Sequence, residues 1–193
     1  MSSDTDPEAD LTRHLWGRRY GTLYRIRLSV LYHLKRERFC DRCDKAANML
    51  TAAAATAAVG VVLKKGGEAE IWAAAITAVL SLIPLVFNPA AAARRHAQCA
   101  EAFKRLQAEA ELAGERWTEP LCDRFASRIL ELEAAEPAPL AALVIDCQNQ
   151  LALGSGHAEN VQPLRLHERW LMHWFDFSAE GIRKMHHGAV LDI

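Results

Sequence analysis

The chain has 193 residues, of which 51% are hydrophobic, and its formal net charge is −1. This length provides one modest folded domain besides any membrane segment. Five cysteines exclude complete disulfide pairing, so reduced thiols are expected. Residues 1–10 are acidic and polar, and therefore no secretory signal peptide is predicted.

The first predicted elements are a disordered leader at residues 1–10 and a basic amphipathic helix at residues 11–45. The helix segment contains no proline, and its large apolar side chains recur every three or four residues. It carries ten Lys and Arg against three Asp and Glu, a net charge of +7. We expect this helix to run close to a membrane.

Arginines and aromatic residues alternate in the first half of this basic helix. They could bind phosphates and stack on bases, as in nucleotide or single-stranded nucleic-acid sites, or they could contact anionic lipid headgroups. Both interpretations remain open at this point. The candidate ligand-binding or lipid-binding residues are Arg18, Arg19, Tyr20, Tyr24, Arg25 and Arg27.

Two segments without charged residues follow, residues 46–63 and residues 71–93, separated by a short polar turn. The first has 18 residues and the second has 23. At 1.5 Å per residue, 18 helical residues span about 27 Å, close to the hydrocarbon thickness of a bilayer. The sequence therefore predicts a transmembrane hairpin at residues 46–93, with spans at 46–63 and 71–89. The alternative is a soluble bundle that buries the same hairpin.

Each predicted span has one stripe of small or polar residues at helical spacing. Such a stripe can pack one helix closely against another, or it can line a pore. The candidates for pore lining or helix packing are Asn48, Thr51, Thr56, Gly60, Thr77, Ser81 and Asn88. Pro84 is a candidate hinge, because proline removes a backbone hydrogen bond inside a helix.

Residues 94–193 are predicted to form a cytosolic helical region. Helices are expected at residues 90–114, with Gly114 as C-cap, at residues 118–135, with Thr118 as N-cap, and at residues 140–153. Residues 163–177 are rich in aromatic side chains. The positive charge before the hairpin places both termini in the cytoplasm, since positive juxtamembrane segments stay on that side.

The sequence carries no recognisable catalytic motif and no complete metal-binding motif. The chain has no phosphate-binding glycine loop, nucleophile elbow or metalloprotease motif, so no catalytic residue, enzyme activity or cofactor is predicted. Cys40 and Cys43 form a CxxC motif without a second pair, and structural zinc requires four ligands. No metal site is therefore predicted.

The order of these segments resembles the SLATT family, which are two-helix membrane effectors of bacterial nucleotide-signalling and other conflict systems. A basic, aromatic lead-in at residues 18–39 enters two spans joined by a very short turn, and an alanine-rich exit at residues 90–98 leads into a cytosolic helix. The resemblance covers residues 15–154 and rests on this architecture. It implies a homo-oligomer in the bacterial inner membrane.

The resemblance also implies a function. Such a chain would form a pore or channel that depolarises or permeabilises the membrane during antiphage defence, an abortive infection. A nucleotide or oligonucleotide signal, or a regulatory protein encoded nearby, would control it. The alternatives are a membrane anchor or assembly protein without a pore, and a soluble helical interaction module.

Overall fold

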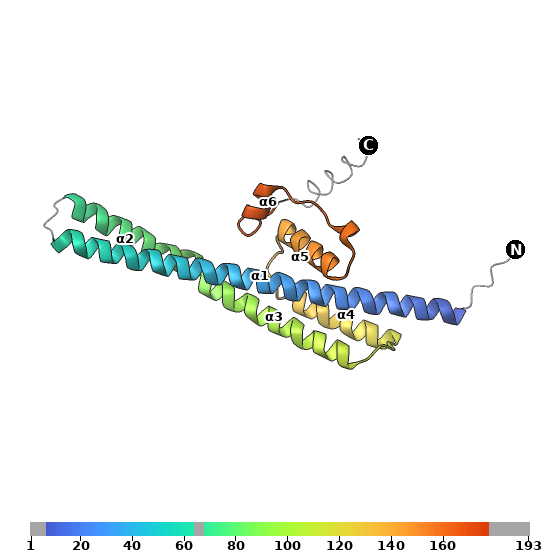
Figure 1. Cartoon of the computed structure of the whole chain (residues 1–193). Coiled ribbons are helices and arrows are strands. Elements are labelled where there is room, and N and C mark those ends of the chain that lie inside the picture. The colour runs from blue at the N-terminus through green and yellow to red at the C-terminus, as the bar shows by residue number, and fades with distance from the viewer. Residues whose placement is uncertain (1–6, 64–67, 178–193) are drawn as a thin grey trace, which may run out of the picture. The chain divides into compact units, whose positions relative to one another are not determined.

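The computed structural model describes residues 7–63 and 68–177, and these residues form helices without any β-strand. The all-α prediction is therefore confirmed. The elements are α1 (Pro7–Leu63), α2 (Glu68–Phe87), α3 (Pro89–Leu112), α4 (Glu119–Glu133), α5 (Ala141–Gly154), the 3-10 helix η1 (Ala158–Asn160) and α6 (Leu166–Leu171) (Figure 1).

The chain divides into two compact units. The first, called the bundle below, comprises Met1–Leu34 and Gln98–Ile193. The second, called the hairpin unit, comprises Lys35–Ala97. Helices α1 and α3 contribute residues to both units, so the boundaries between units fall inside helices.

Helix α1 is longer than the predicted basic helix at both ends. The leader prediction is wrong for residues 7–10, which form its first turn, while residues 1–6 lie outside the described part of the chain. Pro7 occupies the first helical position, where a missing N–H has no consequence, and Glu8 and Asp10 are acidic residues in the positive first turn. No break separates residues 11–45 from residues 46–63.

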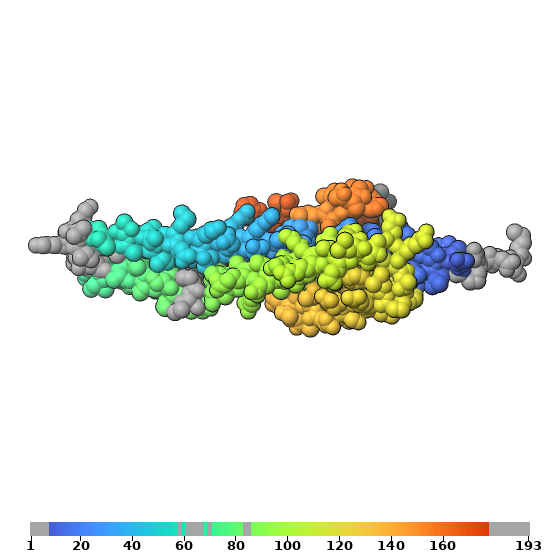
Figure 2. Space-filling view, turned by 90° about the horizontal axis from the view of Figure 1, so that it is seen from below, coloured from blue at the N-terminus to red at the C-terminus, as the bar shows by residue number. Residues whose placement is uncertain are grey.

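The bundle core lies where α1, α3 and α4 meet. Phe103, Leu106, Ile129 and Ile26 are all at most 1% exposed, and they form one cluster. Figure 2 shows α3 and α4 against each other over this face. Fully burying such side chains contributes about 1.5–3 kcal/mol each, so this cluster is the principal stabilising feature of the bundle.

Helix α5 packs on the other side of α1 (Figure 1). Tyr32 of α1 and Leu143 and Cys147 of α5 form a second buried cluster. The Tyr32 hydroxyl accepts a hydrogen bond of 3.1 Å from the backbone N–H of Leu140. Because Leu140 precedes α5, this bond satisfies one of the free donors at the helix start and fixes α5 against α1.

Helix α2 does not continue into α3, because Asn88 separates them. Asn88 has a φ of 41°, in the left-handed region, and its side-chain Oδ1 accepts a 3.1 Å hydrogen bond from the N–H of Ala91. It is therefore the N-cap of α3, and Pro89 occupies the first helical position. The predicted second span ended at residue 89, whereas α2 ends at Phe87.

The predicted helices of the C-terminal half correspond to α3, α4 and α5. Gly114 ends α3 with a φ of 75°, as expected of a C-cap glycine. Thr118 is the N-cap residue of α4, although its side chain makes no capping hydrogen bond. The aromatic-rich residues 163–177 contain only the six-residue helix α6, and residues 178–193 lie outside the described part.

Candidate functional site

The hairpin unit has an apolar surface without a core of its own. Between Asp41 and Arg95, none of the described side chains is buried. Helices need a third element to enclose their apolar side chains, and two antiparallel helices leave most of them outside. The large exposed apolar residues of this surface are Met49, Leu50, Val59, Ile71, Trp72, Ile76, Val79, Leu82, Val86 and Phe87.

Large apolar side chains are highly exposed at both ends of α2. Ile71 is 71% exposed and Phe87 is 75% exposed. Contiguous exposed apolar surface of this kind marks a contact with protein, membrane or ligand. Considering only the residues that the structure describes, no helix combines the length and the apolar character needed to cross a membrane.

The predicted polar stripe residues satisfy most of their hydrogen-bonding groups locally. The hydroxyls of Thr56, Thr77 and Ser81 donate to the carbonyl four residues earlier in the same helix, at 2.9, 2.8 and 2.7 Å. Asn48 Nδ2 donates to Asp44 Oδ2 at 3.1 Å. These groups are already paired within one helix, so they do not need a partner helix.

Other predicted residues of the hairpin have different surroundings. Thr51 makes a contact between the two helices, since its hydroxyl lies 3.5 Å from the carbonyl oxygen of Leu80. A Cβ built on Gly60 would meet nothing within 4 Å, so that face of α1 is open. Asn88 caps α3 as described above. Pro84 lies within the bounds of α2, but its side chain is outside the described residues.

Three of the four arginines predicted to bind a ligand or lipid form ion pairs inside the bundle. Arg18 pairs with Glu119 at 2.5 Å and with Asp123 at 2.7 Å. The hydrogen bond with Asp123 raises the pKa of the Arg18 guanidinium further. The other pairs are Arg25 with Glu133 at 2.8 Å and Arg27 with Glu111 at 2.9 Å. These arginines hold α3 and α4 on α1.

Arg19 differs from these three arginines, because no carboxylate pairs with it among the described residues. Its Nε donates to the Gly114 carbonyl at 3.3 Å. Its guanidinium carbon lies 5.9 Å from the ring centroids of both Trp16 and Trp117. Cation–π contacts leave the positive charge uncompensated, so Arg19 can still attract an anion.

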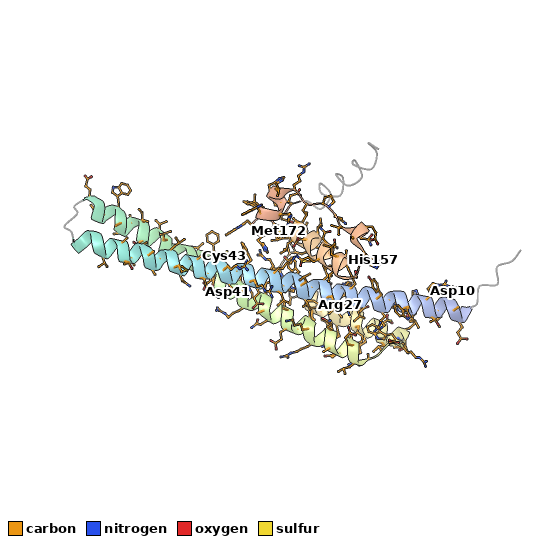
Figure 3. The ribbon with its side chains drawn as sticks, in the orientation of Figure 1. Asp10, Arg27, Asp41, Cys43, His157 and Met172 are labelled. Atoms are coloured by element: carbon orange, nitrogen blue, oxygen red, sulfur yellow. The ribbon has the colours of Figure 1, made fainter. Side chains whose placement is uncertain are left out.

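A groove of about 710 Å³ lies next to Arg19, within the bundle. Helix α1 forms one wall, which includes the predicted residues Tyr20 and Tyr24. The rest of the lining comes from α3, from α5 and from the segment after α5. Figure 3 labels two lining residues, Arg27 on α1 and His157 after α5. The lining residues are Trp16, Arg19, Tyr20, Leu23, Tyr24, Arg27, Glu111, Gln148, Leu151, Ala152, Ser155, His157, Asn160 and Gln162.

The two tyrosines of the groove stack on each other, with ring centroids 6.5 Å apart and an interplanar angle of 22°. Burial raises the pKa of Tyr24, and the neighbouring Tyr20 adds to the shift. The Tyr24 hydroxyl is therefore neutral at physiological pH and is available as a hydrogen-bond donor.

The polar wall formed by α5 and the segment after it was not predicted from the sequence. Asn149 holds this segment in place, because its side chain exchanges two hydrogen bonds of 2.7 Å with the backbone of Gln162. Gln148 and Asn160 then contribute amides to the groove. Spacing within residues 140–162 gives no signal that they face Trp16, since the contact is formed only by tertiary packing.

All five cysteines are free thiols. Burial raises the pKa of Cys40, Cys43, Cys99 and Cys122, so none of these four is activated as a thiolate.

Comparison with protein-family models, with curated proteins and with solved structures finds no match to this chain. The resemblance to the SLATT family therefore stays a prediction.

Proposed function

We propose that this chain is a membrane effector that oligomerises through its hairpin unit and forms a pore in the bacterial inner membrane. The apolar surface of the hairpin unit is the observation that carries the membrane part of the proposal. The defence role, and control by a nucleotide-type signal or a partner protein, rest on the resemblance to the SLATT family.

The physical argument concerns what covers the exposed apolar residues. Leaving a large apolar side chain in water forgoes about 1.5–3 kcal/mol relative to burial. The hairpin exposes such side chains along both α1 and α2, for example Val59 and Val79. Acyl chains would cover all of these faces at once, which no element of the hairpin unit does.

The small and polar stripe supports contacts between copies of the hairpin. The open surface at Gly60 lets a neighbouring backbone approach closely, as small residues do between membrane helices. Asn48 and Thr56 are exposed polar residues on the same helix. In an oligomer these residues would face either a neighbouring helix or a water-filled path.

A soluble interaction module is the second candidate. The finding that no described helix is suited to crossing a membrane favours it. In that case the same apolar surface would be covered by a partner helix or by further copies of the chain in water.

Membrane partition decides between these candidates. We expect the full-length chain to float with liposomes, and Val79→Arg to reduce flotation strongly, because a charge at the centre of a span costs about 2.5–3.5 kcal/mol. Leu130→Arg is the matched control, since Leu130 is 59% exposed in the bundle, close to the 61% of Val79. A wild-type chain that stays monodisperse in buffer without detergent and does not float would exclude the membrane effector.

Pore formation is tested separately from insertion. We expect Asn48→Leu or Thr56→Leu to reduce dye release from liposomes without reducing flotation, because an apolar side chain blocks a wet path. Thr12→Leu is the matched control: the Thr12 hydroxyl also donates to the carbonyl four residues earlier on α1, but in the bundle. Unchanged dye release in both hairpin variants would remove Asn48 and Thr56 from the pore lining.

A further inference from the structure

The groove in the bundle presents aromatic rings along one wall. Trp16, Tyr20 and Tyr24 lie at positions i, i+4 and i+8 of α1, so they follow one face of the helix. Trp16 and Tyr20 are each 56% exposed, although large aromatic side chains are usually more buried. Arg19 and Tyr24 cover part of these two rings, and the exposed remainder is available to a planar ring entering the groove.

Most charged side chains that line the groove are paired with a group of opposite charge, and Arg19 is the exception among the described residues. Arg27 is compensated by Glu111, which also lines the groove. His157 lies 3.0 Å from Glu159, so any charge on this histidine is also matched. Arg19 contributes a positive charge that no described carboxylate compensates. The groove thus offers one uncompensated positive charge, which suits a ligand with one anionic group.

We propose that this groove binds a small ligand that carries one planar aromatic ring and one anionic group. The ring stacks on Tyr20 and Trp16, the anionic group pairs with Arg19, and the amides of Gln148 and Asn160 donate to polar atoms of the ligand. A volume of about 710 Å³ is within the usual range for small-molecule sites. A nucleoside monophosphate and an aromatic carboxylate share this chemistry.

Direct binding to the full-length chain tests the ligand class. The probes are AMP and indole-3-acetate, and the control probes are adenosine, indole, inorganic phosphate and acetate, each of which has only one of the two features. We expect isothermal titration calorimetry to show that AMP or indole-3-acetate binds about tenfold or more tightly than its parts, because a charged hydrogen bond and a stacked ring add their contributions.

The comparison of the two probes identifies the source of the anionic group. Tighter binding of AMP points to a phosphate monoester, and tighter binding of indole-3-acetate points to a carboxylate. ATP should bind no more tightly than AMP, since Arg27 is already paired with Glu111 and leaves Arg19 as the partner for one anionic group. The proposal would be overturned if neither AMP nor indole-3-acetate bound more tightly than its parent without the anionic group, adenosine or indole, or if ATP bound tenfold more tightly than AMP.

Variants of the groove link binding to its residues. Arg19→Gln should weaken binding of the preferred probe about tenfold or more, whereas Arg13→Gln, on an exposed part of the same helix, should leave it unchanged. Tyr20→Ala should weaken binding while Tyr20→Phe retains it, because only the ring stacks. Tyr20 is largely exposed, so both variants should fold. Equal affinity of Tyr20→Ala and wild type would contradict the assignment.

This inference specifies the chemistry of a regulatory site that the proposed function leaves undefined. The two can fail separately, because calorimetric titration of the probes does not depend on liposomes. If the probes bind but the chain does not float with liposomes, the ligand site in the groove is supported and the membrane effector is excluded. If the chain floats but no probe binds, the membrane effector is supported and the ligand site is excluded.

Discussion

The bundle and the hairpin unit use apolar residues in opposite ways. In the bundle, Phe103 and Ile129 are enclosed by side chains from three helices, and ion pairs such as Arg25–Glu133 join helices far apart in the sequence. In the hairpin unit, Val79 and Phe87 are exposed, and the polar contacts of Thr56 and Ser81 remain within one helix. Apolar composition therefore produces a core only where a third helix closes over it.

Helix α1 shows both patterns along one continuous helix. Its bundle part alternates buried residues such as Ile26 with paired arginines such as Arg25, so one face packs and the other is polar. Residues 46–63 have no charged side chain on any face. Both parts of α1 are helical, so they differ in the surroundings that their side chains require and not in backbone conformation.

The largest expected effect is a difference in unfolding free energy between alanine substitutions of two phenylalanines, one in each unit. Phe103 is 1% exposed and its ring centroid lies 5.9 Å from that of His33. Phe103→Ala should lower the free energy of unfolding of the bundle by about 3–5 kcal/mol, because it leaves a cavity in the core. Urea denaturation followed by circular dichroism measures this loss.

Phe87→Ala is the matched variant in the hairpin unit. Phe87 is 75% exposed, so the same substitution should change the free energy of unfolding by no more than about 0.5 kcal/mol. A similar cost at both positions would mean that the hairpin surface is covered in solution, for example by a second copy of the chain.

A smaller difference is expected for two hydroxyl groups. Tyr32→Phe removes the acceptor for the Leu140 N–H, and leaving this donor unsatisfied should cost about 1–3 kcal/mol. Thr51→Val removes the longer 3.5 Å contact with Leu80 and should cost less than about 0.5 kcal/mol. Thermal unfolding of both variants compares them, and a greater loss for Thr51→Val would show that the contact between the hairpin helices is important for stability.

The smallest effect concerns pH and involves thiols in both units. Burial raises the pKa of Cys122 in the bundle and of Cys40 and Cys43 in the hairpin unit, so the folded chain keeps these thiols protonated where the unfolded chain ionises them. Their contribution to stability is therefore complete below the unfolded pKa of about 9 and is lost as pH rises above it.

Urea denaturation at pH 8 and at pH 9.5 measures this loss. Cys122→Ala should make the midpoint less dependent on pH than in the wild-type chain. An identical dependence in both proteins would show that this thiol does not contribute to the loss of stability above pH 9.

Local sequence signals predicted much of the fold. The helices predicted at residues 118–135 and 140–153 correspond to α4 and α5, and Gly114 was predicted as the end of α3. The break at Asn88 was not predicted. Asparagine alone does not indicate a left-handed backbone conformation, which is seen here together with the side-chain cap on the N–H of Ala91. For the aromatic-rich residues 163–177 no element was predicted; they contain α6, and Trp170 and Trp174 are 79% and 62% exposed.

The candidate sites were predicted less completely. The alternation of arginine and tyrosine in α1 located one wall of the groove, but the sequence did not indicate that Arg18 and Arg27 pair with carboxylates of α4 and α3. Such pairing depends on how the helices pack. Among residues 7–63 and 68–177, the same packing leaves Arg19 without a carboxylate, and no local pattern distinguishes it from Arg18.

The turn at Asn88 restricts how this chain can change during evolution. A φ of 41° is readily adopted only by Gly, Asn and Asp, and the following Pro89 suits the first position of a helix. The apolar surface of the hairpin unit is less restricted than Asn88, because Leu, Ile and Val can replace one another there. Distant relatives should therefore be recognisable by Asn, Asp or Gly directly before a proline, between an apolar helix and an alanine-rich one, even where the rest of the hairpin has diverged.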